Sequence, residues 1–349
     1  MKVNWGVIGC GGIAFRRTIP GLVLADNSNL IAVMDTNAEA AENVKKEFNA
    51  KYAFTTVDEL LAIDEIDAVY IATPVFCHKE QVLKAAAAGK HILLEKPMGL
   101  TLEDSIEIEK FCKERGVKLG VGLMMRFNSL HEQVRDLIKS GKLGEIVSMR
   151  AQFTCWYPEI EGAWRQEKAL SGGGALIDLG LHCIDLLRYI SGLEADEVTS
   201  FMSNQIFKYE VEDAASLIAR MKNGALAYVD VAFNIPDDAT TCKIEFYGTG
   251  GGVVINGSLA QDDTGIGELV LTDSTKGYDA QQNRGGAEKI ILKAEGNSNL
   301  YTKEISAFAN ALLNSTEPPV NSTDAIRAQA IADAAYKSAE MRQVVKVNY

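Results

Sequence analysis

Three ionisable side chains share one face of a predicted helix in the middle of the chain. Asp178 and His182 are four residues apart, and Asp185 lies three residues further on. A helix over about 175–190 would project all three in one direction among leucine and isoleucine, where an unpaired polar group costs about 1–3 kcal/mol. A neutral imidazole there suits general acid or base chemistry. The other interpretations are a hydrogen-bonded core histidine and a metal ligand. We predict no metal, because no second histidine lies nearby in the sequence.

A lysine that follows a short apolar run could bring positive charge to the same reaction. Glu95-Lys96-Pro97 ends the run that begins at His91. Pro97 restricts Lys96 to an extended backbone and so helps to fix the direction of its ammonium group. Beside a reacting oxygen, that group would stabilise a developing alkoxide or polarise a carbonyl. Many lysines at strand ends are only solvated charges, so this role depends on His182 lying close by in the fold.

A glycine motif near the N-terminus predicts a dinucleotide site. Residues 7–14 read VIGCGGIA, a G-x-G-x-x-A pattern between an apolar run and a helical pattern. In that context Gly9 permits a tight turn, Gly11 lets the backbone approach a pyrophosphate, and Ala14 lets the helix pack closely on the sheet. Alone the motif is weak, because glycines at such turns often serve packing only.

Asp35 strengthens the dinucleotide interpretation. It lies 21 residues after Ala14, at the predicted end of the second strand. A carboxylate at that place accepts hydrogen bonds from the adenosine ribose and repels a 2′-phosphate. We therefore predict NAD as the cofactor. NADP is the less favoured alternative, supported only by Arg16 and Arg17.

The first third of the chain alternates short apolar runs with stretches of helical period. The runs predict strands near Val3–Ile8, Leu30–Asp35, Ala68–Ala72, His91–Glu95 and Lys118–Val121. The helical stretches lie near Ala14–Leu24, Ala38–Phe48, Phe76–Ala88 and Leu102–Arg115. Strands that are apolar on both faces belong in a parallel sheet covered by helices, so this part should be α/β.

After about residue 123 the pattern changes to α+β. We expect helices near Ser129–Lys139, Ala175–Ile190, Leu300–Leu313 and Asp324–Met341. Strands should lie near Ile146–Trp156, Ser216–Lys222, Ala225–Phe233, Lys243–Tyr247 and Val253–Ile255, with a hairpin turn at Asn223-Gly224. The segment 262–299 is polar and glycine-rich, and we expect a loop or lid-like insertion there.

One face of the predicted strand 225–233 indicates a subunit interface. Alternate residues from Ala225 to Phe233 form an apolar core face, and Leu226, Tyr228, Asp230 and Ala232 form the other face. That second face is too apolar to be an ordinary solvent-exposed surface, so we expect a homo-oligomer, either a dimer or a tetramer.

The composition excludes several classes of partner. The 349 residues include 35 Lys plus Arg and 47 Asp plus Glu, a net charge of −12 that weighs against nucleic acid. No apolar run approaches the roughly 18 residues that span a bilayer, and no signal-peptide core is evident, so we expect no membrane partner and a cytoplasmic location. The six cysteines form no C-x-x-C pair, which suits a reducing compartment.

Several motifs in order resemble the Gfo/Idh/MocA family, which includes glucose-fructose oxidoreductase and inositol dehydrogenase. They are Gly9-x-Gly11-x-x-Ala14, Ala72-Thr73-Pro74-x-x-x-His78, Glu95-Lys96-Pro97 and Gly172-Gly173-Gly174-x-x-x-Asp178-x-Gly180-x-His182-x-x-Asp185. Glu304-Ile305-x-x-Phe308 followed by Pro318-Pro319 is similar to that family's ending. The resemblance implies a Rossmann domain over 1–122 with a doubly wound parallel sheet. It also implies an α+β domain over 123–349 with a large, mostly antiparallel open sheet, whose last helix packs back toward the Rossmann domain.

The resemblance also implies roles for individual residues. Lys96 would contact substrate and nicotinamide, His182 would be the acid/base, and Asp178 would bind substrate or orient that chemistry. The cofactor would contact Gly9, Gly11, Gly12, Ile13, Asp35, Thr73, Pro74, His78, Glu95, Lys96 and Arg165. Two aromatic side chains could stack on a sugar ring, and with them the predicted substrate contacts are Lys96, Arg126, Tyr157, Trp164, Asp178 and His182.

The predicted activity is hydride transfer between NAD(P) and a secondary alcohol or ketone of a sugar, polyol or related cyclic compound. Two alternatives share the fold. The first is an NAD-dependent glycosidase with internal redox cycling, which the sequence distinguishes poorly from a dehydrogenase. A non-catalytic dinucleotide- and sugar-sensing regulator predicts loss of Lys96 or His182, and both are present.

Overall fold

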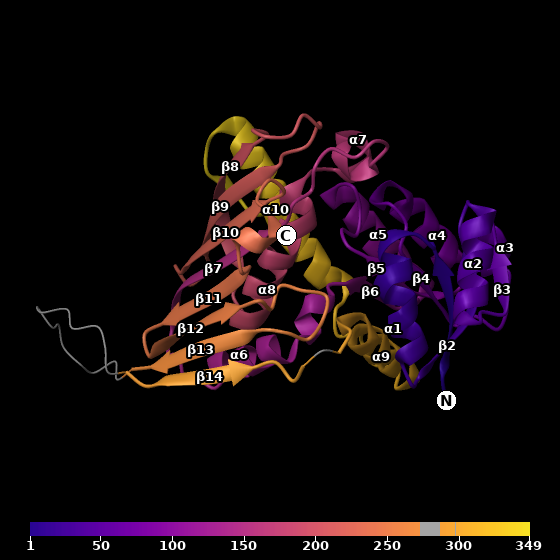
Figure 1. Cartoon of the computed structure of the whole chain (residues 1–349), viewed down its shortest axis with the longest axis horizontal. Helices are drawn as coiled ribbons and strands as arrows, with labels where there is room; N and C mark the ends of the chain where they lie inside the picture. The colour runs from indigo at the N-terminus through magenta and orange to yellow at the C-terminus, as the bar shows by residue number, and fades with distance from the viewer. Residues whose placement is uncertain (273–286, 297) are drawn as a thin grey trace, which may run out of the picture.

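Two β-sheets, one in each half of the chain, organise the structure (Figure 1). The computed structural model describes residues 1–272, 287–296 and 298–349. The N-terminal sheet has six parallel strands in the order β3-β2-β1-β4-β5-β6. This is the doubly wound Rossmann order, in which successive strands are added outward from β1 on one side and from β4 on the other, which leaves a crevice at the carboxyl ends of those two strands.

The N-terminal strands are short and mostly buried. Their bounds are β1 Val3–Ile8, β2 Ser28–Met34, β3 Tyr52–Phe54, β4 Ala68–Ile71, β5 His91–Glu95 and β6 Leu119–Gly122. The connecting helices are η1 Ala14–Thr18 with α1 Ile19–Leu24, α2 Ala38–Phe48, α3 Val57–Leu61, η2 Val75–Cys77 with α4 His78–Ala87, and α5 Leu102–Arg115. The predicted parallel sheet is confirmed. β3 and α3 were not predicted, because three and five residues are too short to show a period.

The C-terminal sheet has nine strands in the order β14-β13-β12-β11-β7-β10-β9-β8-β15. Their bounds are β7 Ile146–Thr154, β8 Ala195–Ser203, β9 Ala214–Met221, β10 Leu226–Ala232, β11 Lys243–Gly248, β12 Gly251–Asn256, β13 Ile266–Leu271, β14 Lys289–Lys293 and β15 Val345–Lys346. Every neighbouring pair is antiparallel except β7 and β10. The large, mostly antiparallel open sheet is thus confirmed, and β8 and β15 are additions to the predicted strands.

The segment 262–299 is where the prediction was wrong. Instead of a loop or lid throughout, it contains β13 and β14, which pair with each other and extend the sheet from β12. β14 exposes most of its side chains at the sheet edge, so it lacks the buried alternation from which strands are predicted. Residues 273–286 and 297 of this segment lie outside the described residues.

Helices cover one face of the large sheet and join the two halves of the molecule. The C-terminal half contains η3 Met124–Phe127, α6 Ser129–Lys139, η4 Trp164–Gln166, α7 Lys168–Ser171, η5 Leu176–Gly180 with α8 Leu181–Ser191, η6 Asp237–Ala239, α9 Leu300–Leu313 and α10 Ser322–Met341. Helix α9 packs on α1, and α10 packs on both α5 and α8. The segment 168–191 is apolar enough to cross a membrane, but 83% of its apolar window is buried inside the protein.

Phe308 shows how closely the two halves meet. Its ring lies 5.6 Å from that of Trp5 in β1, centroid to centroid. At Gly120 in β6, a Cβ would lie only 2.7 Å from Phe308 Cδ2. A glycine is therefore needed there for α9 to pack against the sheet, and this contact fixes one wall of the crevice relative to the other.

Candidate active site

A single cleft of about 770 Å³ lies between the carboxyl ends of the Rossmann strands and the C-terminal unit. Every residue predicted for the site except Arg126 lines it. These residues are Gly9, Gly11, Gly12, Ile13, Asp35, Thr73, Pro74, His78, Glu95, Lys96, Tyr157, Trp164, Arg165, Asp178 and His182. The fold therefore brings together motifs that lie far apart in the sequence.

The glycine loop forms a cradle at one end of this cleft. Gly9 has φ +97°, and a Cβ there would lie 3.0 Å from the Ala72 carbonyl carbon and oxygen, so only glycine fits the turn. At Gly11 a Cβ would meet no atom within 4 Å, so the backbone borders open space. The following helical turn begins at Ala14 and presents its N-terminus to the cleft. These features fit the pyrophosphate of a dinucleotide.

Asp35 is fixed beside the glycine loop. Its Oδ2 accepts a hydrogen bond from Cys10 N and its Oδ1 accepts one from Asn37 N, both at 2.9 Å. Each oxygen keeps a second lone pair with which to accept a ribose hydroxyl. Of the two arginines considered for NADP, Arg16 lines the cleft, whereas Arg17 donates to Gln261 and forms an ion pair with Asp262.

Lys96 and Asp178 form an ion pair that links β5 to the π-helical turn η5. Lys96 Nζ lies 2.5 Å from Asp178 Oδ1 and donates to the Asp178 backbone oxygen at 2.9 Å. Burial alone would raise the pKa of Asp178, but Lys96, followed by Arg165, outweighs it and holds this pKa at about 2. Asp178 is therefore ionised at neutral pH, and it fixes the position of the ammonium group.

His182 lies in α8 in the same cleft, with 5% of its surface exposed. Burial, and then the charge of Lys96, lowers the pKa of its imidazole to about 3. The ring is therefore neutral at physiological pH. It makes no hydrogen bond with any residue in the described part of the chain, including Asp178, so a ring nitrogen is available to a ligand.

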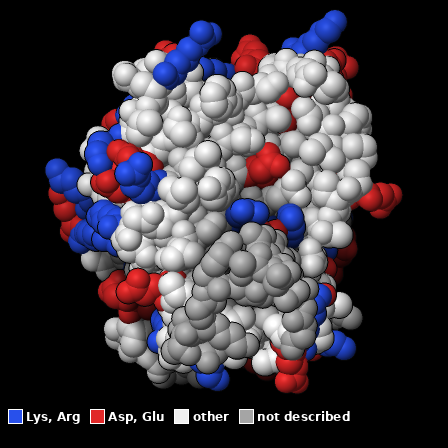
Figure 2. Space-filling model, turned by 90° about the vertical axis from the view of Figure 1, so that its left-hand side faces the viewer, with Lys and Arg blue, Asp and Glu red and all other residues white. Residues whose placement is uncertain are grey.

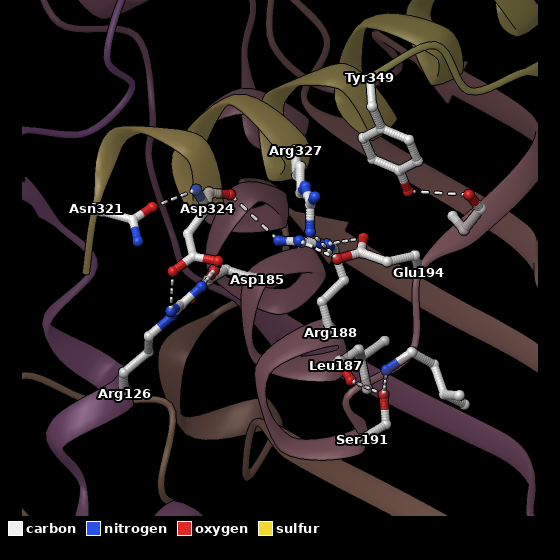
Figure 3. A network of polar contacts seen from close by, with 12 residues as sticks. Arg126, Asp185, Leu187, Arg188, Ser191, Glu194, Asn321, Asp324, Arg327 and Tyr349 are labelled. Atoms are coloured by element: carbon white, nitrogen blue, oxygen red, sulfur yellow. Dashed lines mark hydrogen bonds and ion pairs between the residues drawn. The ribbon is translucent and has the colours of Figure 1, made fainter. Parts of the chain in front are cut away.

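Arg126, which was predicted to contact the substrate, does not line the cleft. Arg126 is only 4% exposed, and it forms ion pairs with Asp185 and Asp324 outside the cleft lining (Figure 3). The π-helical turn η5 places one extra residue before α8, which rotates later side chains by about 100° relative to α-helical spacing. The sequence pattern predicted that Asp185 shares one helix face with Asp178. In the structure Asp178 lines the cleft and Asp185 does not.

Other predicted residues support the cleft wall. The two ring nitrogens of His78 lie 3.0 Å from the backbone oxygens of Pro97 and Thr73, so this buried side chain ties together the turns after β4 and β5. Glu95 accepts a hydrogen bond from Tyr70 Oη at 2.8 Å. The contacts of His78 and Glu95 therefore fix the backbone that carries Thr73 and Lys96.

Aromatic side chains form the wall opposite the Rossmann strands. Tyr157 and Trp164 line the cleft together with Phe153 of β7. Trp164 packs edge-on against Phe76 at 6.5 Å between ring centroids, and the guanidinium of Arg165 lies 4.4 Å from the Trp164 ring. A contact with Phe76, which belongs to η2, places this wall across the domain boundary.

The sequence reasoning missed cleft residues that come from distant segments. The main ones are Phe153, Gln261 and Tyr301, which come from β7, from the loop after β12 and from the first turn of α9. No local motif marks them. Their position depends on where the sheet and α9 lie, which only long-range packing determines.

Comparison with known proteins agrees with this architecture. Residues 3–123 match the model of the oxidoreductase family with an NAD-binding Rossmann fold, and residues 131–254 match the GFO/IDH/MocA C-terminal domain. A 1,5-anhydro-D-fructose reductase from Ensifer adhaerens is 31% identical over 345 residues, 99% of this chain and 98% of that protein. A myo-inositol 2-dehydrogenase from Thermotoga maritima is 26% identical, with 98% of each chain covered.

A solved structure extends the comparison to three dimensions. It is a 3-ketoreductase from Actinomadura kijaniata, in complex with NADP and TDP-benzene. It matches with a TM-score of 0.82 and 26% identity, covering 97% of this chain and 98% of that one. The fold, the motifs and both family matches lead to one conclusion: the chain belongs to the Gfo/Idh/MocA family of NAD(P)-dependent oxidoreductases.

Proposed function

We propose that this protein uses NAD to interconvert a secondary alcohol and a ketone on a sugar, a polyol or a cyclitol. The observation that carries the proposal is the convergence of Lys96, Asp178 and His182 in one cleft with the glycine loop and Asp35. Relatives named for 1,5-anhydro-D-fructose and myo-inositol support a cyclic polyhydroxyl substrate. The aromatic wall of Tyr157 and Trp164 suits the C–H face of such a ring.

The side chains have complementary tasks in this reaction. The nicotinamide, when bound, supplies the hydride acceptor or donor. His182, neutral and without a partner among the described residues, takes the hydroxyl proton during oxidation and returns it during reduction. Lys96 stabilises negative charge on the reacting oxygen, and Asp178 holds Lys96 in place. Burial of His182 and Lys96 strengthens both effects by keeping water away.

NAD is the proposed cofactor rather than NADP. Asp35 stands at the end of β2 beside the glycine loop, where its charge would repel a 2′-phosphate. Arg17, which could have countered that charge, is already paired with Asp262. Arg16 remains at the cleft, so NADP binding is expected to be weaker rather than absent.

A homo-oligomer formed through the open sheet is also proposed. The face of the sheet opposite the helices exposes apolar side chains, among them Val147, Phe201, Ile218 and Leu226. Figure 2 shows wide uncharged areas on this side of the molecule, together with charged residues near its centre and along its margins. Exposed apolar side chains on a sheet face favour a protein partner, and a second copy would cover them with a matching face. The six free cysteines agree with the proposed cytoplasmic location.

The proposed activity is tested with purified protein, NAD or NADP, and a panel of sugars, polyols, cyclitols and glycosides. Absorbance at the NADH wavelength reports net hydride transfer, and chromatography of the products reports glycosidic cleavage. NADH formed from a free sugar or cyclitol is the expected result. Sugar release from glycosides without net NADH would instead indicate the glycosidase alternative. Sugar and NAD binding without any turnover would indicate the regulator.

A further inference from the structure

A buried charge network joins the helix that carries His182 to the segment that enters the C-terminal unit (Figure 3). Arg126, in η3, donates through Nε to Asp185 Oδ2 at 2.8 Å, and its Nη2 donates to the other oxygen of the same carboxylate. Only 4% of Arg126 and 1% of Asp185 is exposed. The bidentate pairing of a planar guanidinium with a carboxylate fixes both the distance between the two groups and their orientation.

The first turn of α10 provides a third support for this network. Arg126 Nη1 donates to Asp324 Oδ2 at 2.9 Å, and Arg188 of α8 donates to the Asp324 backbone oxygen at 3.2 Å. Asn321 accepts a hydrogen bond from Asp324 N at 3.0 Å and so caps the helix. Helix α8 is thus held at Asp185 and, one turn later, at Arg188.

Two points of attachment on one helix determine its rotation as well as its position. Asp185 lies only three residues after His182, so any rotation of α8 that moved the carboxylate would also turn the imidazole. On the other side of the pair, Met124 and Met125 stand next to Arg126 in the chain and line the cleft. The network therefore connects a wall of the cleft to the helix that carries His182.

Such a network is a poor device for stability alone. Burying an ion pair removes both charges from water, and apolar residues of the same volume often stabilise a protein as well or better. What the charge network adds is a fixed distance and orientation between its side chains, which an apolar contact would not impose.

We propose that Asp185, held by Arg126, is a positioning residue that fixes the direction of the His182 imidazole toward the cleft. The inference rests on the proposed function only in assigning proton transfer to His182. The direction of the imidazole can be observed without any turnover.

The test compares Asp185→Asn with a matched control, Glu194→Gln. Glu194 belongs to the same network and pairs with Arg188 and Arg327, but it lies after the end of α8. Both variants replace a carboxylate by its amide. The histidine ring signals are recorded by ¹H–¹⁵N correlation NMR, which is practical because the chain has four histidines. The dissociation constant of NAD and the kcat for the best substrate are measured alongside.

In Asp185→Asn we expect the His182 signals to shift while those of His78, His91 and His131 stay in place. NAD affinity should change by less than about threefold, and kcat should fall by about 10- to 100-fold, since a misplaced acid/base group loses its alignment. The primary deuterium isotope effect on kcat should rise as the chemical step becomes slower. Glu194→Gln should change none of these quantities by more than about threefold.

Unmoved His182 signals with an unchanged kcat in Asp185→Asn would overturn the inference. So would equal shifts of all four histidines, which would show general loosening. If Asp185→Asn does not fold, Arg126→Lys replaces it, because it keeps the charge and loses the bidentate geometry. Absence of turnover in the unmodified protein would count against the proposed function, and the NMR comparison would still decide the positioning role.

Discussion

The ammonium group of Lys96 lies 2.5 Å from Asp178 Oδ1, although the two residues are 82 positions apart in the chain. This contact joins the end of a Rossmann strand to the helical segment that leads into His182. It also shows that the partner of the Asp178 carboxylate is Lys96. Its carboxylate accepts from Lys96, so the tautomer of His182 is not set by a hydrogen bond from its ring to Asp178 within the described residues.

Lys96→Ala and His182→Ala should each lower kcat by about 100-fold or more, because each removes a group that acts on the reacting oxygen or its proton. NAD binding should survive, since the glycine loop and Asp35 are untouched. Steady-state kinetics and the quenching of tryptophan fluorescence by NAD provide the two measurements. Unchanged turnover in both variants would contradict the catalytic roles proposed for Lys96 and His182.

The pH profile of alcohol oxidation should lack a loss of rate near pH 6.5. Burial and the charge of Lys96 lower the pKa of His182 to about 3, so the neutral base persists well below the ordinary range of an imidazole. The expected acid limb of kcat/KM therefore lies below about pH 5. Rates measured from pH 4.5 to 9 test this, and an acid limb centred at about 6.5 would contradict it.

Asp35→Ala should weaken NAD binding more than NADP binding. Removing the carboxylate removes a ribose acceptor for NAD and a source of repulsion for NADP. We expect the ratio of the two dissociation constants to change by at least about tenfold, as measured by titration calorimetry. Because Asp35 also accepts hydrogen bonds from Cys10 N and Asn37 N, the thermal unfolding of Asp35→Ala is compared with that of the unmodified protein as a check on loop structure. Equal weakening of both cofactors would show that Asp35 is structural.

Glu304→Gln should stabilise the protein at neutral and alkaline pH. Glu304 is 2% exposed, its carboxyl oxygens have no hydrogen-bond partner among the described residues, and burial followed by repulsion from Glu95 raises its pKa well above the ordinary value. The folded state therefore retains a proton that the unfolded state releases above about pH 4.5. As a result, this group makes the free energy of unfolding fall as pH rises from about 4.5 toward the raised pKa of the folded state.

Urea unfolding at pH 5, 7 and 9 measures this effect. The stability of Glu304→Gln relative to the unmodified protein should increase with pH, whereas Glu47→Gln on the exposed side of α2 should show no such trend. A pH-independent difference for Glu304→Gln would mean that Glu304 does not hold a proton in the folded state.

Ile218→Lys should weaken self-association through the open sheet. Ile218 in β9 is 42% exposed, and Phe201 in the neighbouring strand β8 is 82% exposed, so a charge placed at position 218 would have to be desolvated in an interface that covers this face. Sedimentation velocity should show a shift toward monomer. Ile106→Lys, at an exposed site on α5, is the control, and equal behaviour of the two variants would argue against this interface.

The sequence by itself determined the features that depend on neighbours along the chain. Gly9, Gly11 and Asp35 could be interpreted because a strand-turn-helix segment encodes its own backbone requirements. The bounds of α2 and α5 agreed with prediction because local caps end them: Asn37 and Thr101 accept hydrogen bonds from the first turns, and Asn49 and Gly116 adopt positive φ.

Tertiary structure decided whatever depends on packing between distant segments. The pairing of Lys96 with Asp178, the entry of Tyr301 into the cleft and the place of β14 at a sheet edge have no local signature. The positions of Arg126 and Asp185 outside the cleft lining were not predicted for the same reason. A π-helical turn changes the rotation of α8, and a buried guanidinium goes where carboxylates from two other helices can neutralise it, which residue spacing alone does not reveal.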